Sequence, residues 1–225
     1  MRKLPVLFAQ ICLFAAAGGI YADTIWDNGA PSTTAGAVKS DIGQPGFGAS
    51  QVGDDFTLTG SATLTQVQWW GLYSEDLPAA DNFTIQFFTI SSGVPASTPL
   101  LSYNVGNIGR TDSGLNASSG EDIYQFTAAI PNTVLGSGQY LVSVFNNQPQ
   151  IDNTWYWVMT DPTFSSQSWN RFGPGNPPWN PPGSADFAFN ISGFSNSASV
   201  PDTSATALLL GLSFAGLVQL RRLIA

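Results

Sequence analysis

Three kinds of residue are absent or scarce in this sequence of 225 residues: it has no histidine, a single cysteine (Cys12) and few charged side chains. Histidine is the commonest metal ligand and the commonest general base at neutral pH, so its absence removes the usual centre of such chemistry. One cysteine can form neither an internal disulfide nor a cysteine-rich zinc site. Charged residues make up 10% of the chain, well below the ~25% usual for soluble domains.

Basic side chains are especially few, with 7 Lys and Arg against 15 Asp and Glu, for a formal net charge of −8. Proteins that bind nucleic acid need clustered Lys and Arg, because these displace counterions from the phosphates. We therefore expect no nucleic-acid partner.

The first residues are organised like a secretory signal peptide. Arg2 and Lys3 precede an apolar stretch over residues 4–17, and Ala22 stands just before Asp23. A basic start, a short apolar stretch and a small residue at the cleavage point define such a leader. The alternative, an N-terminal membrane anchor, would need ~20 apolar residues. The sequence predicts a signal peptide over 1–22, export through the secretion translocon and loss of Cys12 with the leader.

Three features follow one another at the C-terminus. A polar spacer over 195–199 precedes Val200-Pro201-Asp202-Thr203-Ser204, an apolar run covers 205–220, and Arg221-Arg222 comes after it. The apolar run is just long enough to enter a bilayer as a helix, and the arginines would hold its end on the cytoplasmic side. The alternative is a helix packed in the soluble domain, but a helix that is apolar on all sides has no solvent face. We expect a transmembrane helix here.

This tail, residues 200–225, resembles the bacterial VPDSG-CTERM sorting signal, a relative of the PEP-CTERM signal. The matching residues are Val200, Pro201, Asp202, Thr203, Ser204, Arg221 and Arg222, with Thr203 and Ser204 standing where the family has Ser and Gly. The resemblance implies an exosortase as partner, a membrane cysteine peptidase that cuts near the proline-containing motif. It also implies an exported protein of the cell envelope or extracellular surface, held in the membrane by the C-terminal helix until it is processed.

The region between the two signals, residues 23–194, is predicted to be one all-β domain. Short β-branched and aromatic runs recur between clusters of Gly, Pro, Asn and Asp. In one run Phe83, Ile85 and Phe87 alternate with polar residues, the period of a half-buried strand. The strands expected are 23–26, 52–58, 63–70, 82–90, 100–105, 123–129, 138–146, 154–159 and 185–192. Strands without intervening helices indicate stacked antiparallel sheets, a β-sandwich of jelly-roll type.

The order of several aromatic and acidic segments in this domain also resembles the uncharacterised β-sandwich ectodomains found ahead of PEP-CTERM tails. Those segments are Trp26-Asp27-Asn28-Gly29, Asp54-Asp55-Phe56-Thr57-Leu58, Val67-Gln68-Trp69-Trp70-Gly71, Ile123-Tyr124-Gln125-Phe126 and Trp155-Tyr156-Trp157. This second resemblance implies no activity.

Asp54 and Asp55 are the candidate metal ligands, for calcium. Calcium takes six to eight oxygen ligands from carboxylates and carbonyls, and exported sandwiches use it to fix loops. The sequence has no compact run of ligands of the EF-hand type. The alternative is that the Asp residues of this domain are ordinary turn formers exposed to solvent. Apart from this calcium, no cofactor is expected.

Trp70, Trp169 and Trp179 are the candidate ligand-binding aromatics, because flat aromatic faces near Asn and Asp suit carbohydrate. Adjacent residues of a strand point to opposite faces, so one of Trp69 and Trp70 belongs to the core. Trp169 and Trp179 are expected in loops beside Arg171. The alternative is that these rings pack the core and the second face of the sandwich.

Catalytic groups are not evident. Glu75 and Glu121 are the only glutamates, and both fall in polar loops, whereas a glycosidase needs two carboxylates facing one bond. A serine nucleophile would lack its histidine base. We expect no enzyme activity, and predict an exported surface or matrix protein whose sandwich has a structural or adhesive role among extracellular polysaccharides. Two alternatives are a carbohydrate-binding module with an aromatic sugar site and, more remotely, a glycoside hydrolase.

Overall fold

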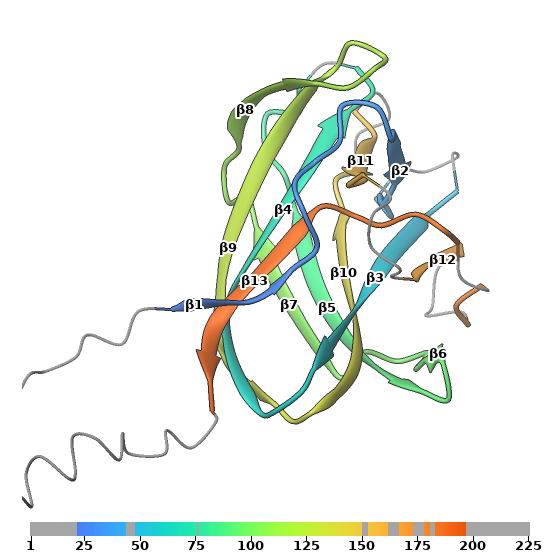
Figure 1. Cartoon of the computed structure of the whole chain (residues 1–225). Helices are drawn as coiled ribbons and strands as arrows, with labels where there is room; N and C mark the ends of the chain where they lie inside the picture. Colours follow the sequence, from blue (N-terminus) through green and yellow to red (C-terminus); the bar gives the residue numbers. More distant parts are fainter. Residues whose placement is uncertain are drawn as a thin grey trace, which may run out of the picture.

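A computed structural model describes residues 22–43, 48–75, 77–149, 153–161, 167–172, 178–180 and 183–196. These residues contain thirteen β-strands and no helix. The strands form two antiparallel sheets of seven and six strands that face each other (Figure 1). The all-β antiparallel sandwich predicted from alternation is therefore confirmed.

The seven-stranded sheet has β4 at its centre. One edge of β4 pairs with β9, and the other edge pairs with β13 along its first part and β11 along its last. Outside these lie β8, β1 and β2. The strands are β1 (Asp23–Asp27), β2 (Ala37–Lys39), β4 (Ala62–Tyr73), β8 (Thr111–Asn116), β9 (Asp122–Leu135), β11 (Trp155–Val158) and β13 (Phe189–Ser195).

The six-stranded sheet has the order β12-β3-β10-β5, and β5 then pairs with β7 and β6. Its strands are β3 (Ser50–Leu58), β5 (Phe83–Ser91), β6 (Val94–Pro95), β7 (Leu101–Gly106), β10 (Gly138–Asn146) and β12 (Ser168–Phe172).

Aromatic rings from both sheets fill the core between them. Trp69 stacks on Phe126 with ring centroids 5.7 Å apart, and Phe83 meets Trp155 edge-on at 5.1 Å. All four side chains are buried. Trp155 lies so close to β4 that a Cβ at Gly71 would be 2.3 Å from its Nε1. A glycine at position 71 is what allows this indole to lie against the strand.

Each of the nine predicted strands overlaps an observed one, and four short strands were missed. The missed strands are β2, β6, β8 and β12. β8 has the sequence TDSGLN and is mostly exposed, so it lacks the apolar alternation by which a strand is recognised. β9 continues past its predicted end because a register shift opposite Leu64 and Gln66 accommodates Pro131.

The two ends of the sandwich differ, and β4 runs from one to the other. Its first residue, Ala62, pairs with Leu135 and Ser195 at what we call the tail end. Its last residue, Tyr73, pairs with Trp155 at the opposite end. β1 begins and β13 finishes at the tail end, where Asp23 pairs with Gly193 (Figure 1).

Ser195 was expected to open the polar spacer, but it is the last residue of β13. The hydrophobic leader stretch and the tail, including Val200 to Ser204, Arg221 and Arg222, lie outside the described residues. Within the part of the chain that the structure describes, no helix has the length and apolarity needed to cross a membrane.

Candidate functional site

The outer face of the seven-stranded sheet carries an apolar and aromatic cluster at the end opposite the tail. Because side chains alternate along a strand, Trp69 and Gly71 of β4 point into the core while Trp70 and Leu72 point outward. Leu72 packs there with Ile123 of β9 and Val158 of β11. The half-buried rings of Trp70 and Tyr156, together with Ala37 and Ala117, pack against these three.

This cluster forms one wall of a hollow of about 240 Å³, which we call the outer-face hollow. Tyr156 supplies an aromatic wall, and Ser74, Ser119 and Glu121 supply polar groups. Its full lining is Gly36, Ala37, Leu72, Ser74, Ala117, Ser119, Glu121 and Tyr156. These residues come from β2 and the residue before it, from β4 and the residue after it, from β11, and from the turn between β8 and β9, segments that are far apart in the sequence.

Glu121 is the charged group of the outer-face hollow. A hydrogen bond from the Ser119 side chain lowers the pKa of Glu121, so this carboxylate is ionised at neutral pH. Its Oε2 atom is buried and accepts no hydrogen bond from any described residue. Oε2 is therefore covered by the protein itself, while the half-buried Glu121 side chain as a whole borders the hollow.

A second hollow, of about 330 Å³, shares Glu121 with the first and opens over the loop that follows β4. We call it the end hollow; its lining is Tyr73, Glu75, Leu77, Gly120, Glu121, Asp122 and Tyr124. The fold thus brings Glu75 and Glu121, the only glutamates, to one hollow. No local pattern indicates this approach, because 46 positions separate the two residues.

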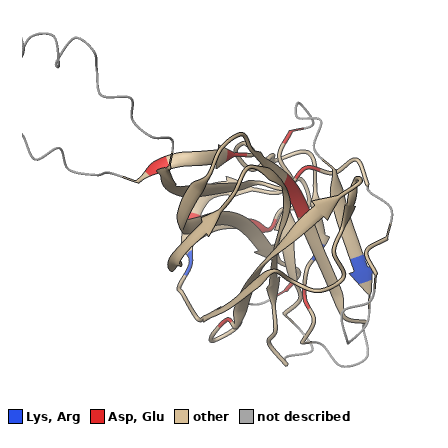
Figure 2. Cartoon of the chain, turned by 90° about the horizontal axis from the view of Figure 1, so that it is seen from below, with Lys and Arg blue, Asp and Glu red and all other residues tan. Residues whose placement is uncertain are grey.

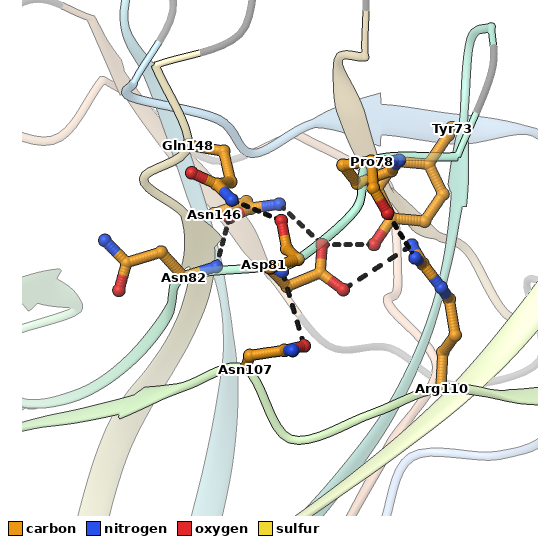
Figure 3. A network of polar contacts seen from close by, with 9 residues as sticks. Tyr73, Pro78, Asp81, Asn82, Asn107, Arg110, Asn146 and Gln148 are labelled. Carbon is orange, nitrogen blue, oxygen red and sulfur yellow. Dashed lines mark hydrogen bonds and ion pairs between the residues drawn. The ribbon is translucent and has the colours of Figure 1, made fainter.

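A buried polar network fixes the loop beside the end hollow (Figure 3). Asp81 accepts hydrogen bonds from the Tyr73 hydroxyl at 2.5 Å and from Asn146 Nδ2 at 3.0 Å. Arg110 lies 3.6 Å from the same carboxylate, stacks on the Tyr73 ring at 5.3 Å and donates to the Pro78 carbonyl. Burial raises the pKa of Asp81. The network ties β4, β10 and the β4–β5 loop together at the end that carries both hollows.

Asp41, also buried, accepts backbone hydrogen bonds from Gly43 at 3.0 Å and Trp155 at 3.2 Å. Burial raises the pKa of Asp41 from its ordinary 3.8 to about 6. The two backbone hydrogen bonds and Lys39 lower this pKa, and the nearby Asp81 carboxylate adds to the increase. Between pH 3.8 and about 6, Asp41 keeps its proton in the folded state and has lost it in the unfolded state. Stability contributed by Asp41 is therefore greatest below 3.8 and falls as pH rises through about 6.

We therefore expect Asp41→Asn, which is neutral at every pH, to flatten the pH dependence of stability. Melting temperatures of wild type and variant should be compared between about pH 4.5 and about pH 7. The wild type should lose more stability than the variant over this interval. Burial also raises the pKa values of Asp54 and Asp81, so the variant will keep part of the slope. Identical slopes in the two proteins would contradict the role given to Asp41.

The two aspartates predicted to hold calcium do not converge. Asp54 and Asp55 are adjacent in β3, so they point to opposite faces of the strand. Asp54 faces the core and contacts Asn28 and Phe187, whereas Asp55 faces outward and accepts a hydrogen bond from Gln139 at 2.8 Å. Among the described residues, no group of three or more acidic side chains could hold a metal ion. One calcium bound by both carboxylates would need them on the same face.

Trp169 and Trp179 are buried, with exposed fractions of 5% and 7%. Trp169 lies in β12 and not in the loop expected for it. Both rings pack with Phe88 and Leu141 on the outer side of the six-stranded sheet. Arg171 stacks on Trp179 at 4.5 Å, and Trp179 Nε1 donates to the Ala96 carbonyl at 3.0 Å. They present little ring surface on which a sugar could stack.

Trp70 is the predicted aromatic that lies on an accessible face, beside the outer-face hollow. Tyr156 was not among the predicted site residues, yet its position between the core residues Trp155 and Trp157 is the alternation that places it on the same face. Leu72, Ser74 and Ser119 carried no comparable signal.

The fold and the tail together define an exported β-sandwich protein with a C-terminal sorting motif. Residues 199–224 match the family model of the VPDSG-CTERM motif. This match confirms the sorting signal predicted from Val200 to Ser204 and Arg221-Arg222, and it implies an exosortase-type processing partner. A comparison of the chain with curated proteins gave no match.

Proposed function

We propose that this chain is a bacterial cell-surface or extracellular-matrix protein that adheres to extracellular polysaccharide through the outer face of its seven-stranded sheet. Its leader takes it through the secretion translocon, and its tail holds it in the membrane until an exosortase processes it. The observation that supports adhesion most directly is the outer-face hollow, which combines the Tyr156 ring with the Glu121 carboxylate.

The chemistry of this hollow suits a sugar. Sugar rings present C–H groups that pack on aromatic faces, and their hydroxyls need donors and acceptors beside those faces. Tyr156 and the neighbouring Trp70 offer the rings. Glu121 offers a carboxylate at the edge of the hollow, and Ser74 and Ser119 offer hydroxyls.

The proposal is a binding role without catalysis, although Glu75 and Glu121 line one hollow. A glycosidase needs one carboxylic acid whose pKa is raised, so that it is protonated and can act on the leaving group. The pKa of Glu121 is lowered, which makes it a poor general acid. A lowered pKa suits the ionised member of such a pair equally well, so the proposal of binding rests on the aromatic ring and hydroxyl groups of the outer-face hollow.

We also infer a jelly-roll topology for the sandwich. The order β3-β10-β5-β7 in one sheet and β1-β13-β4-β9 in the other supports this inference. The chain crosses between the sheets from β3 to β4, from β4 to β5 and from β9 to β10, as paired strands wound into a jelly roll do.

The test is binding of the purified protein to extracellular polysaccharide from cells that make it and to a glycan array. We expect Tyr156→Ala to weaken binding by about tenfold, equivalent to ~1.4 kcal/mol, because a stacking face is lost. Trp70→Ala should weaken binding less, since its ring lies beside the hollow and not in its lining.

Phe172→Ala is the matched control for these two variants. Phe172 is an aromatic residue with 62% of its surface exposed, but it lies in β12 of the other sheet. Its removal should leave binding unchanged. Absence of binding to every polysaccharide tested, or equal losses in Phe172→Ala and Tyr156→Ala, would contradict adhesion through the outer face.

A further inference from the structure

The tail leaves the sandwich at the end farthest from both hollows. Ser195, the last residue of β13, pairs with Ala62 at the start of β4, whereas Leu72 and Tyr73 at the end of β4 line the hollows. Strand residues rise by ~3.3 Å each, so the length of β4 places these two ends about 36 Å apart. The sandwich therefore has a tail end and a hollow end.

Asn196, the last described residue before the tail, is held at the tail end. Its backbone N–H donates to the Ser61 carbonyl at 2.8 Å, and its side-chain Nδ2 lies 3.4 Å from Ser61 Oγ. The Thr63 hydroxyl donates to Asn196 Oδ1 at 3.1 Å. These contacts hold the chain on the turn between β3 and β4 until three residues before the matched motif begins at residue 199.

The chain between Asn196 and the apolar run that starts at residue 205 is too short to let the sandwich turn around. Fully extended, this segment reaches at most about 30 Å. To bring the hollow end against the membrane, it would have to run back past the whole sandwich, over the ~36 Å length of β4. A tail inserted in the bilayer therefore keeps the tail end on the membrane side.

Charge favours the same orientation. Figure 2 shows acidic residues at many places along the described strands and loops and basic residues at few. Residues 23–199 contain fourteen acidic and three basic side chains, so an anionic membrane surface repels the domain as a whole. The tail-end turns at Thr59-Gly60-Ser61 and Gly136-Ser137 are uncharged, with Asp23 of β1 at the same end. At the hollow end, Glu75, Glu121 and Asp122 around the end hollow outnumber the basic residues Lys39 and Arg110.

We propose that, until its tail is processed, the sandwich has its tail end against the membrane surface and its hollow end facing away, so that polysaccharide is bound on the side away from the membrane. This inference rests on the membrane-held tail of the proposed function and adds the orientation of the binding face. The β3–β4 and β9–β10 turns are then the surface that an exosortase-type enzyme meets.

Energy transfer from single fluorophores to acceptor lipids tests this orientation. The full chain after loss of its leader, residues 23–225, has no thiol, so an added cysteine can be labelled alone. Ser137→Cys places the label in an exposed turn of the tail end, and Ser118→Cys places it in an exposed turn of the hollow end. In vesicles with anionic lipid, transfer from position 137 should be several-fold stronger than from position 118.

The outcomes separate the two proposals. Association with vesicles together with equal transfer from both positions, or stronger transfer from position 118, would overturn the orientation and leave the membrane-held tail standing. Failure of the full chain to associate with vesicles would overturn the membrane-held tail and the orientation with it. The melting temperatures of both cysteine variants should match that of the wild type, and a chain truncated after Asn196 should show no transfer from either position.

Discussion

Asp54→Ala is expected to destabilise the sandwich by about 3–5 kcal/mol, because it removes a buried acceptor that joins the two sheets. Asp54 belongs to β3 of the six-stranded sheet, and its carboxylate faces the core. Asp54 Oδ2 accepts hydrogen bonds from Asn28 Nδ2 at 2.9 Å and from the Phe187 backbone N–H at 2.6 Å. Asn28 directly follows β1 and Phe187 lies just before β13, and both strands belong to the seven-stranded sheet.

The loss follows from what alanine leaves behind. Asn28 is buried and Phe187 is in the core, so water cannot replace the acceptor at either donor. Each unsatisfied buried donor costs about 1–3 kcal/mol. The expected loss of stability counts these unsatisfied donors and adds nothing for a lost charge, because burial raises the pKa of Asp54 well above its ordinary range.

Equilibrium unfolding in urea at fixed pH measures this effect. Asp112→Ala serves as the control, because Asp112 lies exposed in β8 and accepts one hydrogen bond, from Gly114. That substitution should cost less than about 1 kcal/mol. A loss for Asp54→Ala no larger than that for Asp112→Ala would show that the two sheets do not depend on this contact.

The fold was predictable because alternation is a local property of the sequence. Phe83, Ile85 and Phe87 all became core residues, as their spacing in the sequence indicated. Pairing partners were not predictable, because β4 takes its neighbours from β9, β11 and β13, which follow it at long and unequal intervals. No local pattern encodes which strands meet.

The candidate site was less predictable than the fold for the same reason. The outer-face hollow needs the β8–β9 turn to lie beside Tyr156, and no short stretch of sequence reports that approach. The divergence of Asp54 and Asp55 could, in contrast, be predicted from the sequence. Two adjacent strand residues point to opposite faces, and this rule, used to separate Trp69 from Trp70, applied equally to the two aspartates.

Trp179→Ala is expected to destabilise the protein by about 3–5 kcal/mol, the usual cost of emptying a buried tryptophan site. Trp179 packs edge-on against Phe88 with ring centroids 5.2 Å apart and lies under the guanidinium of Arg171. Arg171 is held in turn by Gln51 Oε1 at 2.8 Å and the Ser97 carbonyl at 2.8 Å. Removing the indole leaves a cavity and exposes one side of this arginine.

The same variant separates a structural role for Trp179 from the binding role predicted for it. If the ring packs the outer side of the six-stranded sheet, Trp179→Ala lowers the melting temperature while the fraction that remains folded binds polysaccharide as the wild type does. Phe172→Ala, an exposed aromatic in the same region, should change stability by no more than about 0.5 kcal/mol. Loss of binding in folded Trp179→Ala, with stability unchanged, would instead place the polysaccharide on this face. Burial argues for the first result, because a ring that is 7% exposed offers almost no face to a ligand.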